Sequence, residues 1–147
     1  MMGVQIIGDE VFYSSMQKMS LSTQIEANDE IVKIGTEIRN NILNSMRDTK
    51  KRTNNPVKGR RVAAHFPSLP GQAPAIDSGR LANDIKMSTT RTGISNVAVE
   101  VGDVSVPYGK VLEESPNPKI QRPWLKPSYA DIRIEERIGN IIARKTI

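Results

Sequence analysis

The side chains that could carry out acid–base or nucleophilic chemistry are scarce in this sequence. The chain has 147 residues, with one histidine and no cysteine. The lack of cysteine excludes disulfides, thiolate metal sites and thiol catalysis, and a single imidazole excludes every scheme that needs two. His65 lies between Ala64 and Phe66, where we expect it to pack or to form a backbone hydrogen bond.

Other catalytic patterns are also missing. The sequence around Ser15, Ser68 and Ser78 does not have the pattern of a nucleophile elbow, so serine–histidine hydrolysis is not expected. No glycine pattern precedes a Lys-Ser or Lys-Thr pair, as a nucleotide-binding loop would require. The acidic residues lack the paired spacing of a metal or glycosidase site. We therefore expect no enzymatic activity, no cofactor and no bound metal.

A basic segment is the remaining chemical signal. The net charge is +5, and the excess is concentrated in residues 56–82, where Asp77 alone opposes four basic residues. These are Lys58, Arg60, Arg61 and Arg80. The run from Lys58 to Arg61 has the chemistry to contact phosphates or an acidic protein surface, and it can equally be solvated. Because the excess is confined to one loop-like segment, a small nucleic-acid-binding module is the alternative and not the main prediction.

The bulk properties predict one soluble domain. No apolar run approaches the roughly eighteen residues of a membrane span, and residues 1–7 lack the basic stretch of a signal peptide. Hydrophobic residues make up 37% of the chain and aromatic residues 4%. These fractions are low for a compact globule, so the termini or a long loop can depend on a partner for their order. We expect no membrane contact.

Two segments have the apolar period of a helix. Residues 23–48 begin with capping-box spacing at Thr23 and Glu26, and Gly35 within them permits the close approach of another backbone. Their apolar stripe consists of Ile25, Ile31, Ile34, Ile38, Ile42 and Met46. Residues 128–144 are the second predicted helix. Its stripe consists of Ile134, Ile138, Ile141 and Ile142.

Between these two helices, alternating apolar and polar residues predict strands, and prolines predict loops. Residues 80–106 alternate apolar and polar positions, and they predict two or three antiparallel strands with turns at 91–93 and 102–103. Residues 54–79 hold four prolines and three glycines. They predict a loop so long that it is expected to be functional or ordered by a partner. Residues 107–127 are expected to be short and irregular.

The order of helix, strands and helix predicts an α+β fold. It would consist of a long N-terminal helix, a small antiparallel sheet and a C-terminal helix, with the long proline-rich loop 54–79. We expect residues 23–147 to form a single domain. Residues 1–22, in which Gln5 to Phe12 has a weak strand pattern, are predicted to be an N-terminal arm.

Three separate segments carry a family resemblance. They are 68–74 (Ser-Leu-Pro-Gly-Gln-Ala-Pro) with 77–81 (Asp-Ser-Gly-Arg-Leu), 107–113 (Pro-Tyr-Gly-Lys-Val-Leu-Glu) and 122–127 (Arg-Pro-Trp-Leu-Lys-Pro). In this order and at these separations they resemble the minor tail and head–tail joining family of long-tailed bacteriophages. Members of that family are called tail-component, neck or tail-completion proteins. The resemblance extends over residues 60–145.

One departure from the family pattern follows Glu113. Members of the family usually place an aromatic residue and a glycine directly after this glutamate, whereas this chain continues with Glu114-Ser115-Pro116. The loop that follows Glu113 is therefore expected to contact a different neighbour.

The resemblance implies a structural virion protein, located in the neck or upper tail and in the host cytoplasm during assembly. Several copies would form a closed ring that joins the capsid connector to the tail. Its partners would be further copies of itself, head-closure or connector proteins, and the tail terminator or tail tube protein. Double-stranded DNA would pass through the lumen without sequence-specific contacts. A tail terminator that caps the tail tube is the alternative within the same class.

A closed ring needs two different surfaces on each copy, because its contacts are heterologous. Our candidates are the loop 54–79 and the segment 114–126, with an edge strand of the 85–106 sheet as a further contact. The candidate interface residues are Pro70, Gly71, Pro74, Gly79, Arg80, Leu81, Tyr108, Glu113, Arg122, Pro123 and Trp124, and the candidates for contacts with phosphate or an acidic partner are Lys58, Arg60 and Arg61. The only tryptophan, Trp124, either caps the domain's own core or anchors in a pocket of the next subunit.

Overall fold

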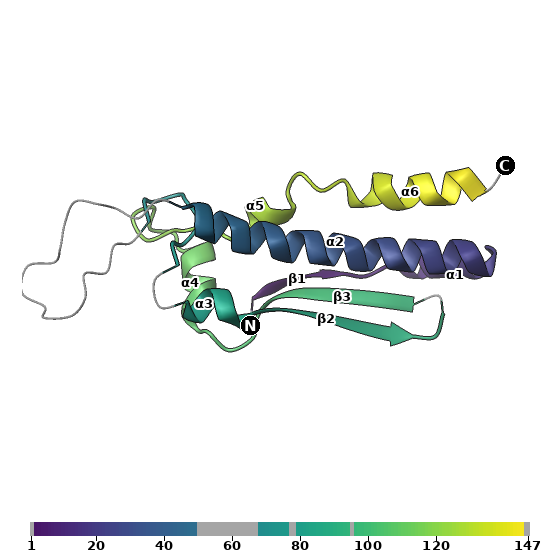
Figure 1. The fold of residues 1–147 in the computed structure, drawn as a ribbon, viewed down its shortest axis with the longest axis horizontal. Coiled ribbons are helices and arrows are strands. Elements are labelled where there is room, and N and C mark those ends of the chain that lie inside the picture. Colours follow the sequence, from purple (N-terminus) through teal and green to yellow (C-terminus); the bar gives the residue numbers. More distant parts are fainter. Residues whose placement is uncertain (1, 50–67, 77–78, 95, 146–147) are drawn as a thin grey trace, which may run out of the picture.

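The computed structural model describes residues 2–49, 68–76, 79–94 and 96–145. Along the chain the elements are β1 (Gly3–Ile6), α1 (Glu10–Gln17), α2 (Leu21–Asp48), α3 (Arg80–Asp84), β2 (Ile85–Thr92), β3 (Asn96–Asp103), α4 (Tyr108–Glu114), α5 (Lys126–Tyr129) and α6 (Ile134–Lys145). The predicted α+β class, with a long N-terminal helix, a small antiparallel sheet and a C-terminal helix, is confirmed. The long helix α2 forms the middle layer, between the sheet on one side and α5 and α6 on the other (Figure 1).

The predicted apolar stripe of α2 is the centre of the core. Ile31, Ile34, Ile38, Ile42 and Met46 are buried, as their spacing of three and four residues requires for one helical face. Ile25, predicted to extend this stripe, is instead 48% exposed.

The predicted capping box of α2 is wrong. The N-cap is Ser20, whose side chain accepts a hydrogen bond from the N–H of Thr23. The helix therefore begins at Leu21, earlier than predicted, because Ser20 caps the N–H of Thr23 and so places Thr23 inside the first turn.

The sheet is antiparallel with the strand order β1-β3-β2, so β3 is its central strand. Val97, Val99 and Val101 of β3 are buried beneath α2. On the opposite face the strands carry polar side chains, among them Gln5 and Glu100. This alternation is expected of an antiparallel sheet with one covered face.

Gly35 permits α2 to lie close to the sheet, as its position in the stripe predicted. A Cβ at this position would overlap Cγ1 of Val99 and lie 3.3 Å from the sulfur of Met87. Gly35 itself is buried. The helix can therefore approach the sheet at this point only because Gly35 has no side chain.

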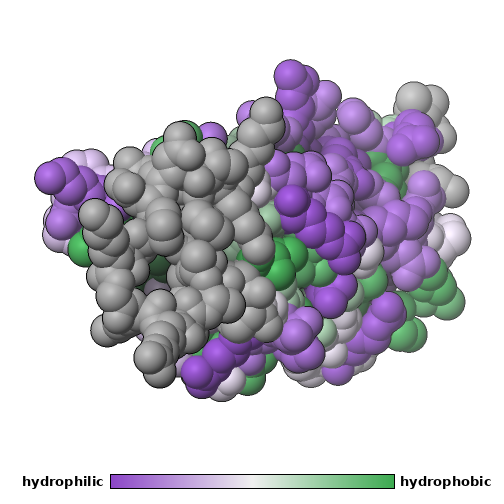
Figure 2. All heavy atoms as spheres, turned by 60° about the vertical axis from the view of Figure 1, so that its left-hand side comes forward, coloured by the Kyte–Doolittle hydropathy of each residue, from purple (hydrophilic) through white to green (hydrophobic). Residues whose placement is uncertain are grey.

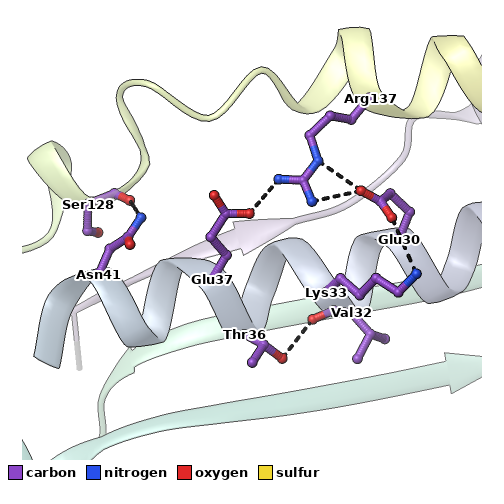
Figure 3. Close-up of polar contacts among 8 residues, drawn as sticks. All are labelled: Glu30, Val32, Lys33, Thr36, Glu37, Asn41, Ser128 and Arg137. Atoms are coloured by element: carbon purple, nitrogen blue, oxygen red, sulfur yellow. Dashed lines mark hydrogen bonds and ion pairs between the residues drawn. The ribbon is translucent and has the colours of Figure 1, made fainter. Parts of the chain in front are cut away.

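The last helix is held on α2 by apolar contacts and by one arginine. Ile138 and Ile141 of α6 are buried. Arg137 extends from α6 to α2, where its Nε lies 2.8 Å from Oε1 of Glu30 and its Nη1 bonds Glu37 (Figure 3). The hydrogen bond that Arg137 donates to Glu37, followed by the one it donates to Glu30, raises the pKa of Arg137, and burial opposes the shift.

The predicted second helix, 128–144, is divided in two. Asn41 of α2 donates a hydrogen bond to the carbonyl oxygen of Ser128 at 3.0 Å (Figure 3). In a continuous helix that oxygen would accept from the N–H of Ile132, which instead donates to Tyr129. A contact between distant segments thus ends α5 and lets the chain resume as α6.

Two further predictions about the elements are wrong. Residues 107–127 were expected to be irregular, but Tyr108–Glu114 form α4. Val104 and Val106 were expected to form a strand after a turn at 102–103, but Gly102 and Asp103 belong to β3 and the two valines lie in the loop between β3 and α4. The two long strands and the turn at Gly93, which has a φ of +76°, are as predicted.

The first residues pack as part of the domain. Gly3–Ile6 pair with β3, so a strand exists here but shares only Gln5 and Ile6 with the predicted range 5–12, and Glu10–Gln17 form α1 instead. Met16 of α1 is fully buried and packs with Ala27 and Ile141. Among the helices that the structure describes, none has the length and apolarity needed to cross a membrane.

Candidate functional site

The segments 68–74, 107–113 and 122–127 meet at one end of the molecule, beside α4 (Figure 1). Glu113, at the end of α4, joins the second segment to the third. Its carboxylate accepts hydrogen bonds from the N–H groups of Trp124 at 2.6 Å, Leu125 at 2.9 Å and Lys126 at 2.9 Å. A carboxylate at the start of a helix satisfies donors that have no partner within the helix. Glu113 therefore fixes where α5 begins.

Trp124 makes a second link between the same two segments. Its ring nitrogen donates to the carbonyl oxygen of Gly109 at 3.0 Å, and the residue is 1% exposed. Of the two roles considered for Trp124, the structure shows the first, in which the indole packs in the domain's own core. Because the ring is buried, it cannot be the anchor that fills a pocket on a neighbouring subunit.

Arg122 ties the first segment to the third. Its Nε donates to the carbonyl oxygen of Ser68 at 3.1 Å, and its Nη1 donates to Lys119 and Gln121 at 2.9 Å each. The N–H of Gly71 then donates to Gln121 at 3.1 Å. Gly71 has a φ of +81°, which glycine adopts without strain and which bends the loop at this point. These bonds hold two loops in one conformation.

A second carboxylate, Asp84, fixes the loop that leads into α4. It accepts from the N–H groups of Val104 at 2.8 Å, Ser105 at 2.7 Å and Val106 at 3.0 Å, and from the hydroxyl of Ser105. The N–H of Ser105 is the main cause that lowers the pKa of Asp84 to about 2, helped by Val106, the Ser105 hydroxyl and Val104 and opposed by burial. This loop is the segment predicted as a strand.

Asp103 and Gly109 join α4 to the sheet. Asp103 is 1% exposed and accepts a hydrogen bond from the N–H of Met2. A Cβ on Gly109 would overlap Oδ2 of Asp103. The glycine of the second segment is therefore required for packing, in addition to its carbonyl bond with Trp124.

A groove opens beside this cluster. It has a volume of about 640 Å³, and its walls are the last turns of α2, the Gly71 loop and the start of α5. The lining is mixed and includes the polar residues Ser45 and Asp48 as well as Pro123 and Trp124. Its position follows from the bonds of Arg122 and Glu113, which place the loops that form its walls.

The predicted interface residues divide into a buried and an exposed group. Leu81, Glu113, Arg122 and Trp124 are buried and hold the cluster together. Pro74, Gly79 and Pro123 are partly exposed, and Pro70, Gly71, Arg80 and Tyr108 are exposed. Only the exposed and partly exposed residues can contact another molecule, so the buried ones act by positioning them.

The surface around the cluster is mixed. Figure 2 brings this end of the molecule forward, and beside the atoms drawn in grey it shows hydrophilic residues with smaller, separate hydrophobic areas. Leu69, Val111 and Ile120 are among the exposed apolar side chains here, at 45%, 55% and 46%. A contact at this end would therefore combine apolar side chains with polar groups, as non-obligate interfaces do.

The basic candidates Lys58, Arg60 and Arg61, and the single histidine His65, lie outside the described residues. Within the described ranges no cluster of three or more acidic or histidine side chains could hold a metal ion.

The sequence did not point to Asp84, Asp103 or Arg137. Each acts on a residue that is distant in the chain, and none lies in a recognisable motif. The one available signal was position, since Asp84 is the last residue of a short helix before a strand.

Comparison with known proteins gives no match to a family model, to a curated protein or to a solved structure.

Proposed function

We propose that this chain is a structural, non-enzymatic ring subunit of a tailed bacteriophage. It would lie at the neck, where the ring joins the capsid connector to the tail and double-stranded DNA passes through the lumen. Its partners would be further copies of itself, the head-closure or connector proteins, and the tail terminator or tail tube protein.

The observation that carries this proposal is the meeting of the three family-like segments. They are separated in sequence, and Glu113, Trp124 and Arg122 bond them to one another. The residues that carry the resemblance are thus the same ones that hold the cluster together. A chance likeness would not be expected to select residues that act as one unit.

The exposed parts of the cluster supply one of the surfaces that a ring needs. The loop carrying Pro70 has little freedom left to lose, because Arg122 bonds Ser68 and Gly71 bonds Gln121 on either side of it, and Tyr108 belongs to helix α4. Fixed loops lose less entropy on binding than flexible ones. This property favours repeated, identical contacts between copies.

The proposal is tested by removing the chain from the phage that encodes it. We expect filled capsids and tails of normal length that do not join, and we expect purified protein to restore joining. Tails of uncontrolled length would instead assign the chain to the tail terminator. Normal infectious particles would contradict both placements.

A nucleic-acid-binding module, suggested by Lys58, Arg60 and Arg61, is the alternative from another class. Such a module would bind duplex DNA with an affinity that falls steeply as salt rises. Retention of duplex DNA at low salt, with no association with virion parts, would favour it over the ring subunit.

A further inference from the structure

We propose that neighbouring copies join edge to edge through their sheets, with β2 of one copy pairing in parallel with β1 of the next. This inference rests on the proposed ring and names the contact that closes it. It starts from the two outer strands of the sheet, β1 and β2, which pair only with β3 in the described structure.

The outer edge of β2 is long and regular. All eight of its residues pair with β3 in one continuous register, from Ile85 with Asp103 to Thr92 with Asn96. The strand contains no proline and no bulge, and residues 88–92 are exposed. Proteins usually protect such an edge, because its free N–H and C=O groups can pair with another strand.

The register shows which backbone groups face this edge. The N–H of Asp103 donates to the carbonyl oxygen of Met2, on the β1 side, at 2.9 Å. Along a strand of an antiparallel sheet, successive residues direct their N–H and C=O groups alternately to one neighbouring strand and to the other. The even-numbered residues of β3 therefore bond β2. Consequently Met87, Thr89 and Arg91 direct their N–H and C=O groups outward.

An independent contact agrees with this assignment. Ile85 is two residues before Met87, so its carbonyl oxygen should also point outward. This oxygen accepts a hydrogen bond from the side chain of Arg39 at 3.4 Å and not from β3. By the same alternation, Gly3, Gln5 and Ile7 direct their backbone groups outward from the β1 side. No other described residue bonds the outward backbone groups of Met87, Thr89 or Arg91.

Cyclic symmetry determines the direction of the joint. β1 and β2 are both antiparallel to β3, so they run parallel to each other. Rotation about an axis that lies roughly along the strands preserves their direction from copy to copy. The β1 strand of the next copy therefore runs parallel to β2.

The residues of β1 and β2 then lie at the same positions along the strand direction. Gly3–Ile6 and Lys86–Thr89 lie beside the same four residues of β3. A neighbour at the same height places its Val4 beside Met87 and its Gln5 beside Ser88. Met87, whose backbone groups point outward, thus lies opposite Val4 of the neighbour, whose backbone groups bond its own β3. In a parallel ladder a bonding residue lies opposite one that bonds the other way, so this arrangement is the required one.

The side chains support the same pairing. Met87 and Val4 are partly buried on the core face, whereas Ser88 and Gln5 are exposed on the other. The charges are also complementary. β2 carries Lys86 and Arg91 and no acidic residue, and the exposed Asp9 and Glu10 follow β1.

Cross-linking tests the contact directly, because the chain has no cysteine. Neighbouring strands lie about 4.8 Å apart, within the range that a disulfide spans. The double variant Gln5→Cys with Ser88→Cys is oxidised and separated on a denaturing gel. We expect a ladder of covalently joined chains that ends at the copy number of the ring.

The single variants are the matched controls. Gln5→Cys alone and Ser88→Cys alone should remain uncross-linked. A disulfide dimer from Ser88→Cys alone would show a two-fold contact between β2 strands and would overturn the proposal. If native mass spectrometry reports a closed ring but the double variant gives no ladder, the edge contact is wrong and the ring subunit stands. A protein that stays monomeric, alone and mixed with tail ends, and gives no ladder would count against both.

A backbone variant gives a second, independent test. Thr89→Pro removes an outward N–H, which the sheet of its own copy does not use, and proline is tolerated at such edge positions. We expect the ladder to disappear while the circular dichroism spectrum is kept. Thr89→Ala retains the N–H and should keep the ladder. An unchanged ladder in a folded Thr89→Pro variant would contradict the proposed pairing.

Discussion

The layered body and the α4 end of this molecule are stabilised in different ways. In the body, α2 rests on the sheet through a periodic apolar stripe, and Ile34, Ile38 and Ile42 are fully buried. At the α4 end, irregular segments are held by side chains that bond backbone groups, with Glu113 accepting three N–H groups. The body thus depends on packing and the α4 end on a few directed bonds, which concentrates the effect of single substitutions there.

The largest effect is expected for Glu113→Gln. The amide group would turn a donor toward backbone N–H groups that now face a carboxylate. Leaving a buried donor unsatisfied should lower the free energy of unfolding by about 3 kcal/mol. Urea denaturation measures this loss.

Glu114→Gln is the control for that experiment. Glu114 has 55% of its side chain exposed and forms a 3.8 Å ion pair with Lys110, so the change should be within about 0.5 kcal/mol. Equal losses in the two variants would show that the α4 end does not depend on Glu113.

Packing in the body is tested by Gly35→Ala. A new Cβ would overlap Val99, and such overpacking should destabilise the fold by about 2 kcal/mol, despite the better helix propensity of alanine. Gly139→Ala is the matched variant in α6, where a Cβ meets nothing within 4 Å. It should stabilise the protein by up to about 1 kcal/mol. If thermal melting shows both variants to be stabilised, α2 is not in close contact with the sheet.

A smaller effect is expected for Arg137→Ala, which removes the polar link between α6 and α2. Arg137 has 32% of its side chain exposed, and Glu30, which it bonds, has 17% exposed. The free energy of unfolding should therefore fall by about 1 kcal/mol. Arg133→Ala, whose ion pair with Glu136 is much more exposed, should change stability by less than about 0.5 kcal/mol. Hydrogen exchange of the α6 amides should rise only in the first variant; unchanged exchange would contradict the link.

The smallest effect on stability is expected for Asp84→Asn, and it should depend on pH. Its pKa is lowered from 3.8 to about 2 in the folded protein. A pKa that is lower in the folded protein stabilises the fold at pH values above the pKa of the unfolded chain. This contribution is lost as the pH falls through the pKa of the folded protein. The stability difference between the wild type and Asp84→Asn should therefore shrink between about pH 4 and pH 2. A difference that is constant over this range would show that Asp84 is not held by the loop.

These two regions also differ in what could be predicted from the sequence. The stripe of α2 and the alternation of β3 follow from burial of one face, and both were predicted with nearly correct boundaries. The α4 end was recognised only through its motifs, which did not reveal that Glu113 and Trp124 face inward. Bonds such as those of Asp84 and Asn41 join residues far apart in the chain, and no local period predicts them.

The central claim is that copies of this chain form a closed ring, alone or on tail ends. The most direct measurement is the mass of the purified protein, with negative-stain images, alone and mixed with the tail tube protein of its phage. The account predicts one closed oligomer of fixed copy number, or a monomer that joins tail ends as rings. A monomer that stays monomeric and ignores virion parts would contradict it.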